Sequence, residues 1–213
     1  MNTLPVRRSI VDLCADLSSR GHLAGTGGNV ALRIDAERIA VTPSATDYLT
    51  MTEADVCVLR LSDLAQIEGK LAPSVESGLH ARVLRARPEV QASIHTHQPV
   101  ASACALLGRA LEVPAGPLQH ALGRRIPMVG YAPSGSAWLS GRLARQLRGD
   151  TNAYLMFNHG VLCCGTTTAT ALQAVEDLET LAKTLLLRSI AARAQREPFM
   201  QPALRRVTDA LAG

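Results

Sequence analysis

The chain has 213 residues, of which 47% are hydrophobic, 19% are charged and 3% are aromatic, and its formal net charge at pH 7 is +4. This composition is typical of a globular chain that forms one domain around an apolar core, and it excludes an intrinsically disordered protein. The single Trp and three Tyr leave few rings for stacking on bases, which argues against a protein that binds single-stranded nucleic acid.

The first half of the chain predicts one helix followed by short strands. Apolar residues at helical spacing predict a helix over residues 5–21, and a tight polar loop follows at 25–29. Thr50 to Glu53 resembles the capping box of one short helical turn. Alternating and β-rich segments predict strands over residues 29–34, 38–42, 56–61 and 65–68.

The second half alternates more clearly between helix and strand patterns. Helices are predicted over residues 74–87, 99–107, 134–148 and 168–196. Strands are predicted over residues 90–95, 126–129, 153–158 and 161–164. Pro198 and Pro202 are expected to break the last helix and to leave residues 198–213 as a C-terminal tail. The pattern predicts a single α/β domain over residues 1–213, with a largely antiparallel sheet between helices.

Cysteine usage and the N-terminus point to the cytoplasm. The five cysteines form no CxxC pair, which favours reduced thiols. The segment that follows Arg8 is not the apolar segment of a secretory signal, and no long apolar window predicts a transmembrane helix. The arginines form no basic run, so we expect neither nucleic acid nor a membrane as a partner.

The strongest chemical signal is the segment His95-Thr96-His97 at the end of a predicted strand. If the strand continues through it, both imidazoles point to the same side and can reach one ion. His159 ends another apolar strand, and Glu76 lies in the first turn of a predicted helix, with His80 as a rival ligand on the same helix face. Three imidazoles and a carboxylate suit Zn²⁺, or another divalent metal such as Mn²⁺ or Co²⁺.

Each of these residues also has a purely structural interpretation. His95, His97 and His159 can be hydrogen-bonded histidines near strand ends, and an acid such as Glu76 stabilises a helix N-terminus through the helix dipole. Histidine is scarce in this chain, however, and its concentration at the ends of apolar strands favours the metal site.

Three polar loops offer groups that can bind an anion. The first presents backbone N–H groups between glycines, the second follows a strand, and the third opens a helix. Each loop alone is explained as a turn or a cap, but together with a metal site they suggest a small phosphorylated substrate. The residues singled out are Thr26, Gly28, Asn29, Ser44, Ala45 and Ser74.

Five motifs carry a resemblance to a known family. They are GTGGN at 25–29, TPSA at 42–45, PSVE at 73–76, HTH at 95–97 and NHG at 158–160. In this order and spacing, over about residues 6–190, the chain resembles the class II aldolase/adducin family, which includes fuculose-1-phosphate aldolases, epimerases and phosphotetronate decarboxylases. The resemblance implies a three-layer α/β/α domain that assembles as a homotetramer with sites at subunit interfaces.

The resemblance also implies roles for individual residues. Glu76, His95, His97 and His159 match the ligands of one divalent metal per subunit, usually Zn²⁺, and Glu76 matches the general acid/base, whereas His80 matches a helix residue that does not bind metal. The loop residues named above match the phosphate site, with Ala45 in place of a common Gly. The implied reaction is retro-aldol cleavage of a small phosphorylated ketose through a metal-stabilised enediolate.

One departure leaves the reaction open. Fuculose-1-phosphate aldolase carries a Tyr in the stretch that matches residues 115–120, but this chain has none there, so Gln119 or His120 is a candidate to take part instead. The departure motivates an alternative, a decarboxylase of a phosphorylated 3-keto sugar acid of the 3-oxo-tetronate 4-phosphate type, with Arg124 or Arg125 on the carboxylate. A non-enzymatic module like the adducin head domain is a third hypothesis, although those domains have lost the metal ligands.

Overall fold

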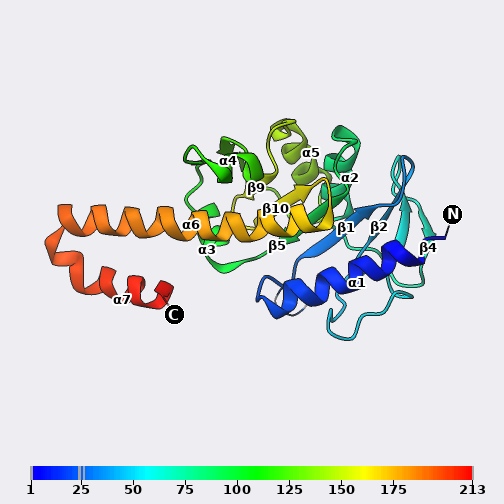
Figure 1. Ribbon diagram of the computed structural model, residues 1–213, viewed down its shortest axis with the longest axis horizontal. Helices are drawn as coiled ribbons and strands as arrows, with labels where there is room; N and C mark the ends of the chain where they lie inside the picture. Colours follow the sequence, from blue (N-terminus) through cyan, green and yellow to red (C-terminus); the bar gives the residue numbers. More distant parts are fainter. Residues whose placement is uncertain (1, 24, 26, 213) are drawn as a thin grey trace.

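An eight-stranded sheet forms the centre of the computed structural model, which describes residues 2–23, 25 and 27–212 (Figure 1). The strand order is β4-β3-β2-β1-β5-β10-β9-β8, and all neighbours are antiparallel except the parallel pair β8 and β9. The strands are β1 Asn29–Arg33, β2 Arg38–Val41, β3 Cys57–Arg60, β4 Gln66–Glu68, β5 Ala92–Thr96, β8 Met128–Val129, β9 Ala153–Met156 and β10 Gly160–Gly165. The predicted, largely antiparallel sheet is confirmed.

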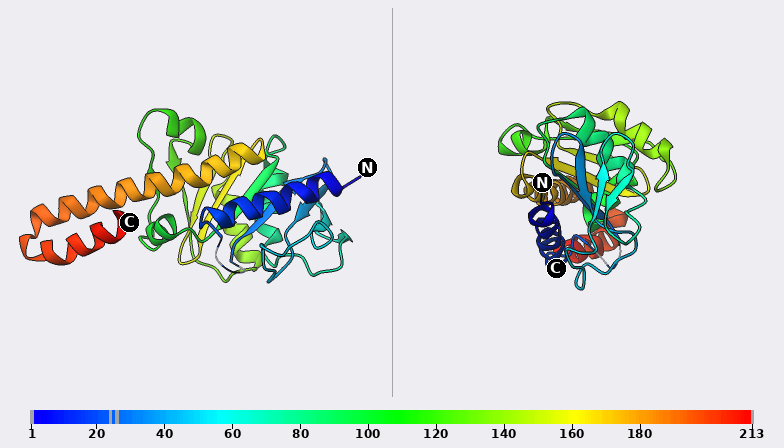
Figure 2. Two further views of the ribbon diagram at one scale, coloured as in Figure 1. Left: turned by 60° about the horizontal axis from the view of Figure 1, so that its bottom comes forward. Right: turned by 90° about the vertical axis from the view of Figure 1, so that its right-hand side faces the viewer.

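Helices cover both faces of this sheet and make it the middle of three layers (Figure 2). One face packs against α1 Leu4–Ser19, α3 Pro99–Ala105 and α6 Thr168–Arg196. The other face packs against α2 Ser77–Ala86 and α5 Ala137–Gln146. Within β10, Val161 and Cys163 enter the first core, whereas Leu162 and Cys164 enter the second. This alternation follows from the two-residue period of a strand and confirms the expected α/β/α architecture.

The C-terminal segment is helical rather than an irregular tail. The 3₁₀ turn η1 Pro198–Met200 and helix α7 Gln201–Ala212 fold back along the end of α6, and this helical arm projects from the body of the domain (Figure 1). Pro198 does end α6 as expected. Pro202 lies in the first turn of α7, where its missing N–H has no helical partner to lose, so it is tolerated there.

Three shorter segments also differ from the prediction. Residues 50–53 form no helical turn, because the Asp55 carboxylate accepts the N–H and the hydroxyl of Thr52 in a non-helical turn. Helix α4 Pro117–Leu122 lies in a stretch where the sequence predicted no helix. The single strand expected at 126–129 is two strands, β7 Arg125–Ile126, which pairs with β6 Leu111–Glu112, and β8 in the main sheet. Such one-turn and two-residue elements depend on tertiary contacts rather than on their own sequence.

All five cysteines are free and buried. In the part of the chain that the structure describes, every helix is too short or too polar to cross a lipid bilayer.

Leu178 tests the first of the two cores, because it lies on α6 with none of its surface exposed. Leu178→Ala should lower the free energy of unfolding by about 2–5 kcal/mol, since it leaves a cavity among tightly packed side chains. Urea denaturation measures this change. The matched variant Leu49→Ala alters a leucine that is 77% exposed and should shift the value by less than about 0.5 kcal/mol. Equal effects of the two variants would contradict this account of the core.

Candidate metal centre

Three histidines converge at one end of the sheet. His95 belongs to β5, His97 follows one residue after that strand ends, and His159 lies in the turn between β9 and β10. Because β10 pairs with β5, this turn places His159 beside the other two. One ring nitrogen from each histidine lies within 4.8 Å of the others, and the ring centroids are 4.7 to 5.5 Å apart.

Glu76 brings a carboxylate to the same point. It is the residue before the first turn of α2, and only 5% of its surface is exposed. Its Oε2 lies 3.2 Å from His95 Nε2, and its Oε1 lies 2.9 Å from His159 Nε2. Burial raises the pKa of Glu76, but the hydrogen bonds that its carboxylate accepts, with the one from His159 the largest, outweigh that effect and hold the pKa well below its ordinary value. The side chain makes no capping hydrogen bond to the helix, and its carboxylate contacts the histidines instead.

The donor set fits a divalent cation. His95 Nδ1 lies 2.7 Å from the carbonyl oxygen of Val161, which can only accept, so Nδ1 carries the proton and Nε2 presents a lone pair. That Nε2 faces both His97 Nε2, at 3.0 Å, and the Glu76 carboxylate. Burial and the neighbouring His95 lower the pKa of His97 to about 4, so its imidazole is neutral at pH 7. A single proton could form a hydrogen bond in only one of these two contacts of His95 Nε2. A cation bound by both nitrogens and by the carboxylate oxygen would balance the lone pairs of all three groups.

Two glycines allow the backbone to pack closely against the segment that carries His95 and His97. A Cβ atom on Gly160 would lie 2.6 Å from both His97 Cδ2 and the Thr96 carbonyl oxygen. Gly28 has a φ of +83°, and a Cβ there would lie 2.6 Å from the His95 carbonyl oxygen. Side chains at either position would therefore displace the histidine segment.

The three predicted anion loops meet at this same end of the sheet. The Ser44 N–H donates to the Ala72 carbonyl at 2.9 Å, and the Ser74 N–H donates to the Thr42 carbonyl at 3.0 Å. The Val30 N–H donates to the Thr42 hydroxyl at 3.2 Å, so that hydroxyl supports the loop. Thr26, the remaining predicted contact of the first loop, lies outside the described residues.

Individual loop residues carry further constraints. Ser74 is buried, and its hydroxyl accepts the Glu76 N–H at 3.2 Å. Ala45 has a φ of +51°, a left-handed conformation that costs a non-glycine residue about 1 kcal/mol, which gives a physical reason for the glycine expected at this position. The loop sequence therefore places Ser44 and Ala45 at a turn whose shape is held by neighbouring backbone groups.

Asn29 and His80 form hydrogen bonds behind Glu76 that the sequence did not predict. The Asn29 side chain is 5% exposed and donates to Glu76 Oε2 at 2.9 Å, so it supports the carboxylate directly. His80 is fully buried, and its two ring nitrogens bond Ser93 Oγ at 2.8 Å and Asn29 Oδ1 at 2.7 Å. Because both nitrogens are occupied, His80 is not a ligand in this arrangement.

Two residues at the site were missed in the sequence. Ser134 donates from Oγ to Glu76 Oε1 at 2.8 Å, although the sequence placed it only at the start of the helix predicted over residues 134–148, whose cap in the structure is Ser136. The Tyr48 hydroxyl donates to the Gly28 carbonyl at 2.6 Å and thereby anchors the backbone of the first loop. No local pattern marks either contact, because both join segments far apart in the chain.

The candidates from the segment at residues 115–125 are not joined to this cluster. Gln119 Nε2 donates to the Val113 carbonyl at 2.7 Å, and His120 is exposed near the end of α4. Arg125 pairs with Glu112 on the surface. Within the described residues of one chain, no hydrogen bond links these side chains to Glu76 or the three histidines.

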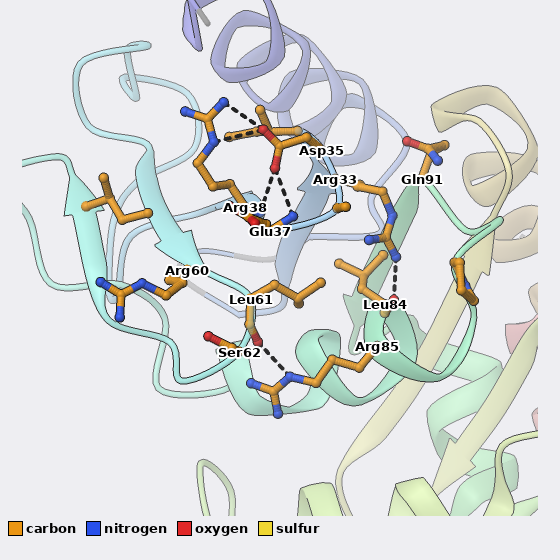
Figure 3. A pocket seen from close by; sticks show the side chains of 14 residues that line it. Arg33, Asp35, Glu37, Arg38, Arg60, Leu61, Ser62, Leu84, Arg85 and Gln91 are labelled. Carbon is orange, nitrogen blue, oxygen red and sulfur yellow. Dashed lines mark hydrogen bonds and ion pairs between the residues drawn. The ribbon is translucent and has the colours of Figure 1, made fainter.

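A cavity of about 1030 Å³ lies at the opposite end of β1 and β5 (Figure 3). Its wall includes arginines that are held by neighbouring groups: Arg38 pairs with Asp35, and Arg85 Nε donates to the Leu61 carbonyl. A smaller cavity of about 260 Å³ borders Glu76 itself, between α2 and α5. Of the four converging residues, Glu76 lines the smaller cavity, and none lines the larger one.

Known proteins are similar to this chain in fold and in part of its sequence. The family model described as the class II aldolase and adducin N-terminal domain matches residues 8–186. L-fuculose phosphate aldolase from Escherichia coli strain K12 is 30% identical over 179 residues, which cover 84% of this chain and 81% of that protein.

Two solved structures are similar as well. An L-fuculose 1-phosphate aldolase superposes with a TM-score of 0.81 at 25% identity, over 89% of this chain and 88% of its own. A Klebsiella pneumoniae protein that is described with three alternative activities, aldolase, epimerase and decarboxylase, superposes with a TM-score of 0.79 at 27% identity, over 87% of this chain and 90% of its own.

Gly160 offers a test of the cluster that changes no candidate ligand. Gly160→Ala should weaken the binding of Zn²⁺ by about 10- to 100-fold, because the new methyl group displaces the His97 ring. Calorimetric titration of metal-free protein measures this affinity. The control Gly141→Ala adds a methyl group in α5 with no atom within 4 Å and should leave Zn²⁺ binding unchanged. Undiminished Zn²⁺ binding by Gly160→Ala would contradict the arrangement described above.

Proposed function

The chain belongs to the class II aldolase and adducin family, and on that basis we propose that it is a metal-dependent lyase that cleaves a carbon–carbon bond of a small phosphorylated ketose by a retro-aldol reaction. The observation that carries the proposal is the convergence of the Glu76 carboxylate with three imidazoles beside three polar loops. Its similarity to L-fuculose phosphate aldolase supports the substrate class.

Four side chains of this chain would hold the cation. His95, His97 and His159 supply ring nitrogens, and Glu76 supplies a carboxylate oxygen. We propose Zn²⁺, or another divalent metal such as Mn²⁺ or Co²⁺, with one ion per subunit. When bound, the cation acts as a Lewis acid toward the negative charge that develops on the substrate oxygens. The Val161 carbonyl fixes the His95 ring in the tautomer that this role needs.

We assign the proton transfer to Glu76. The hydrogen bonds to its carboxylate lower its pKa, so Glu76 is ionised at neutral pH but becomes an effective base only when one of these bonds is released. Oε1 is bonded by Ser134, which is exposed, and by His159. Release of the Ser134 hydrogen bond, together with the use of His159 Nε2 as a ligand of the cation, would free this oxygen to take the proton and raise its basicity, whereas Oε2 stays held by Asn29.

The loops would hold the phosphate of the substrate. Backbone N–H groups near Gly28, the Asn29 amide and the hydroxyls of Ser44 and Ser74 are the proposed contacts, together with Thr26 and the turn at Ala45. Since these loops adjoin the histidine cluster, binding of the phosphate would orient the bond to be cleaved toward Glu76.

Assembly and location follow from the family resemblance. We propose a homotetramer with sites at subunit interfaces, located in the cytoplasm. The projecting arm of α6 and α7 and the 76% exposure of Trp138 support further contacts with other subunits, and five buried free thiols suit a reducing compartment.

A decarboxylase of a phosphorylated 3-keto sugar acid is the second candidate function. The lack of a Tyr within residues 115–120 favours it, because decarboxylation has no aldehyde product to protonate. The similar Klebsiella pneumoniae protein is itself described with decarboxylase among its alternatives. Release of CO₂ from a 3-oxo-tetronate 4-phosphate would support this function, and its absence would remove it. A non-enzymatic module, the third candidate, would bind no metal when purified without a histidine tag.

The proposed reaction predicts products that can be measured directly. Metal-loaded protein incubated with a panel of ketose 1-phosphates should release dihydroxyacetone phosphate and an aldehyde, because the bond between C3 and C4 breaks. A chelator should abolish the activity, and added Zn²⁺ should restore it. Failure to release either product from every member of the panel would contradict the aldolase function.

His95 tests the role of the cluster. His95→Ala should abolish both bound metal and lyase activity, because a ligand is lost, and should leave the far-ultraviolet circular dichroism spectrum nearly unchanged. Metal analysis and the lyase assay measure the two losses. The control His22→Ala alters a half-buried histidine after α1 and should retain both metal and activity. Full metal content in His95→Ala would be inconsistent with the proposed site.

A further inference from the structure

A chain of buried hydrogen bonds extends from Glu76 into the interior between α2 and the sheet. Ser93 Oγ lies 2.8 Å from His80 Nδ1, His80 Nε2 lies 2.7 Å from Asn29 Oδ1, and Asn29 Nδ2 lies 2.9 Å from Glu76 Oε2. Ser93 and His80 are completely buried, and the other two are 5% exposed. Water is therefore excluded from most of these hydrogen bonds.

The chemistry of Glu76 and Asn29 fixes which atom donates and which accepts in each of these hydrogen bonds. The Glu76 carboxylate only accepts, so the Asn29 NH₂ group must face it, and the amide oxygen of Asn29 must face His80. His80 Nε2 therefore carries the proton. In the neutral ring Nδ1 is then an acceptor, and the Ser93 hydroxyl donates to it. Reversal of any link would place two acceptors or two donors against each other in a buried site.

The neutral state of His80 agrees with this order. Burial lowers the pKa of His80 to about 3, with the neighbouring His95 acting in the same direction. No acidic side chain is bonded to the ring, whose two partners are a hydroxyl and an amide oxygen. His80 is thus a donor at Nε2 and an acceptor at Nδ1.

We propose that His80 is a positioning residue that sets which way the Asn29 amide faces, and that it thereby holds Glu76 and prepares the first anion loop for a phosphate group. With Nε2–H bonded to the amide oxygen, the NH₂ group of Asn29 is directed away from His80: one N–H meets Glu76, and we assign the other to an anion in the loop. A reversed amide would present its oxygen to the carboxylate and to the phosphate, and would repel both.

The expected effects on phosphate binding and on kcat rest on the proposed function. The assignment of donors and acceptors in the hydrogen bonds does not depend on it. The helix places His80 four residues after Glu76, on the same face, so α2 supplies both ends of the connection through Asn29. A histidine that only filled space would not require a donor at Nε2.

The tautomer provides a direct test on the unmodified protein. A nitrogen-15 correlation spectrum of the histidine rings should show His80 protonated at Nε2 and not at Nδ1. The resonance is assigned by its loss in His80→Gln. Protonation at Nδ1 would overturn the proposal, because Nε2 could then not donate to Asn29.

Two substitutions of His80 separate positioning from packing. His80→Leu fills the space without a donor, whereas His80→Gln places an amide N–H near the position of Nε2. His80→Leu should raise the Kd for inorganic phosphate and lower kcat by about 10- to 100-fold each, since Asn29 is free to reverse. His80→Gln should recover most of both losses. Equal impairment in two folded variants would overturn the proposal, as would wild-type values in His80→Leu.

Ser93 keeps the proposal testable if His80→Leu does not fold. Ser93→Ala removes the donor to Nδ1 and lets the ring change tautomer, so phosphate binding should weaken in the same direction. The control Ser102→Ala removes a buried hydroxyl that makes no hydrogen bond among the described residues, and it should leave phosphate binding unchanged. Indistinguishable behaviour of Ser93→Ala and Ser102→Ala would overturn the proposal.

A wrong assignment of the proposed function would give a different result from a wrong assignment of the positioning role of His80. If wild-type protein cleaves no ketose phosphate, the lyase assignment is wrong. The His80 tautomer and the Kd for inorganic phosphate of the variants then still decide the positioning role, because neither measurement uses turnover.

Discussion

The Glu76 carboxylate is held from both sides, and the rest of the site is arranged around it. His95 and Asn29 contact Oε2, whereas His159 and Ser134 contact Oε1. Burying an ionised carboxylate is costly unless each oxygen is paired, so these four partners are a condition for placing an acid at the end of the sheet. The same pairing leaves three imidazoles directed at one point, which is what a divalent cation requires.

The sheet explains why the partners meet. Asn29 and His95 are directly paired across β1 and β5, and both side chains face the layer that contains α2. Helix α2 begins beside this pair, so Glu76 and His80 reach the same two strands from one helix. The site is therefore built from a rigid strand pair and one helix, with Ser134 as the contribution of a more exposed segment. Oε2 of Glu76 is thus held by the strand pair, whereas Oε1 is held in part by the more exposed Ser134.

Local sequence patterns were sufficient to predict most of the helices and strands. Apolar periodicity predicted the main helices, with α6 at residues 168–196, and it predicted most strands to within a residue or two, because these elements bury one face and the period of that face is visible in the chain. The convergence of His95, His97 and His159 was also predicted, from scarce histidines at the ends of apolar strands. The glycine of the NHG motif, Gly160, lies in the structure at a position where a side chain would clash with His97.

Other features depended on the tertiary structure alone. The partners of Asn29, the occupied nitrogens of His80 and the Ser134 bond to Glu76 join residues between 47 and 58 positions apart. Such contacts are fixed by strand order and register, which local patterns do not encode. The fold of α7 against α6 belongs to the same class, since a proline marks where a helix is interrupted but not whether the chain resumes one. The sequence by itself thus determined which elements form and which residue types carry the chemistry. The packing of α2 on β1 and β5 decided which of them touch, because a hydrogen bond between distant segments exists only once the layers are assembled.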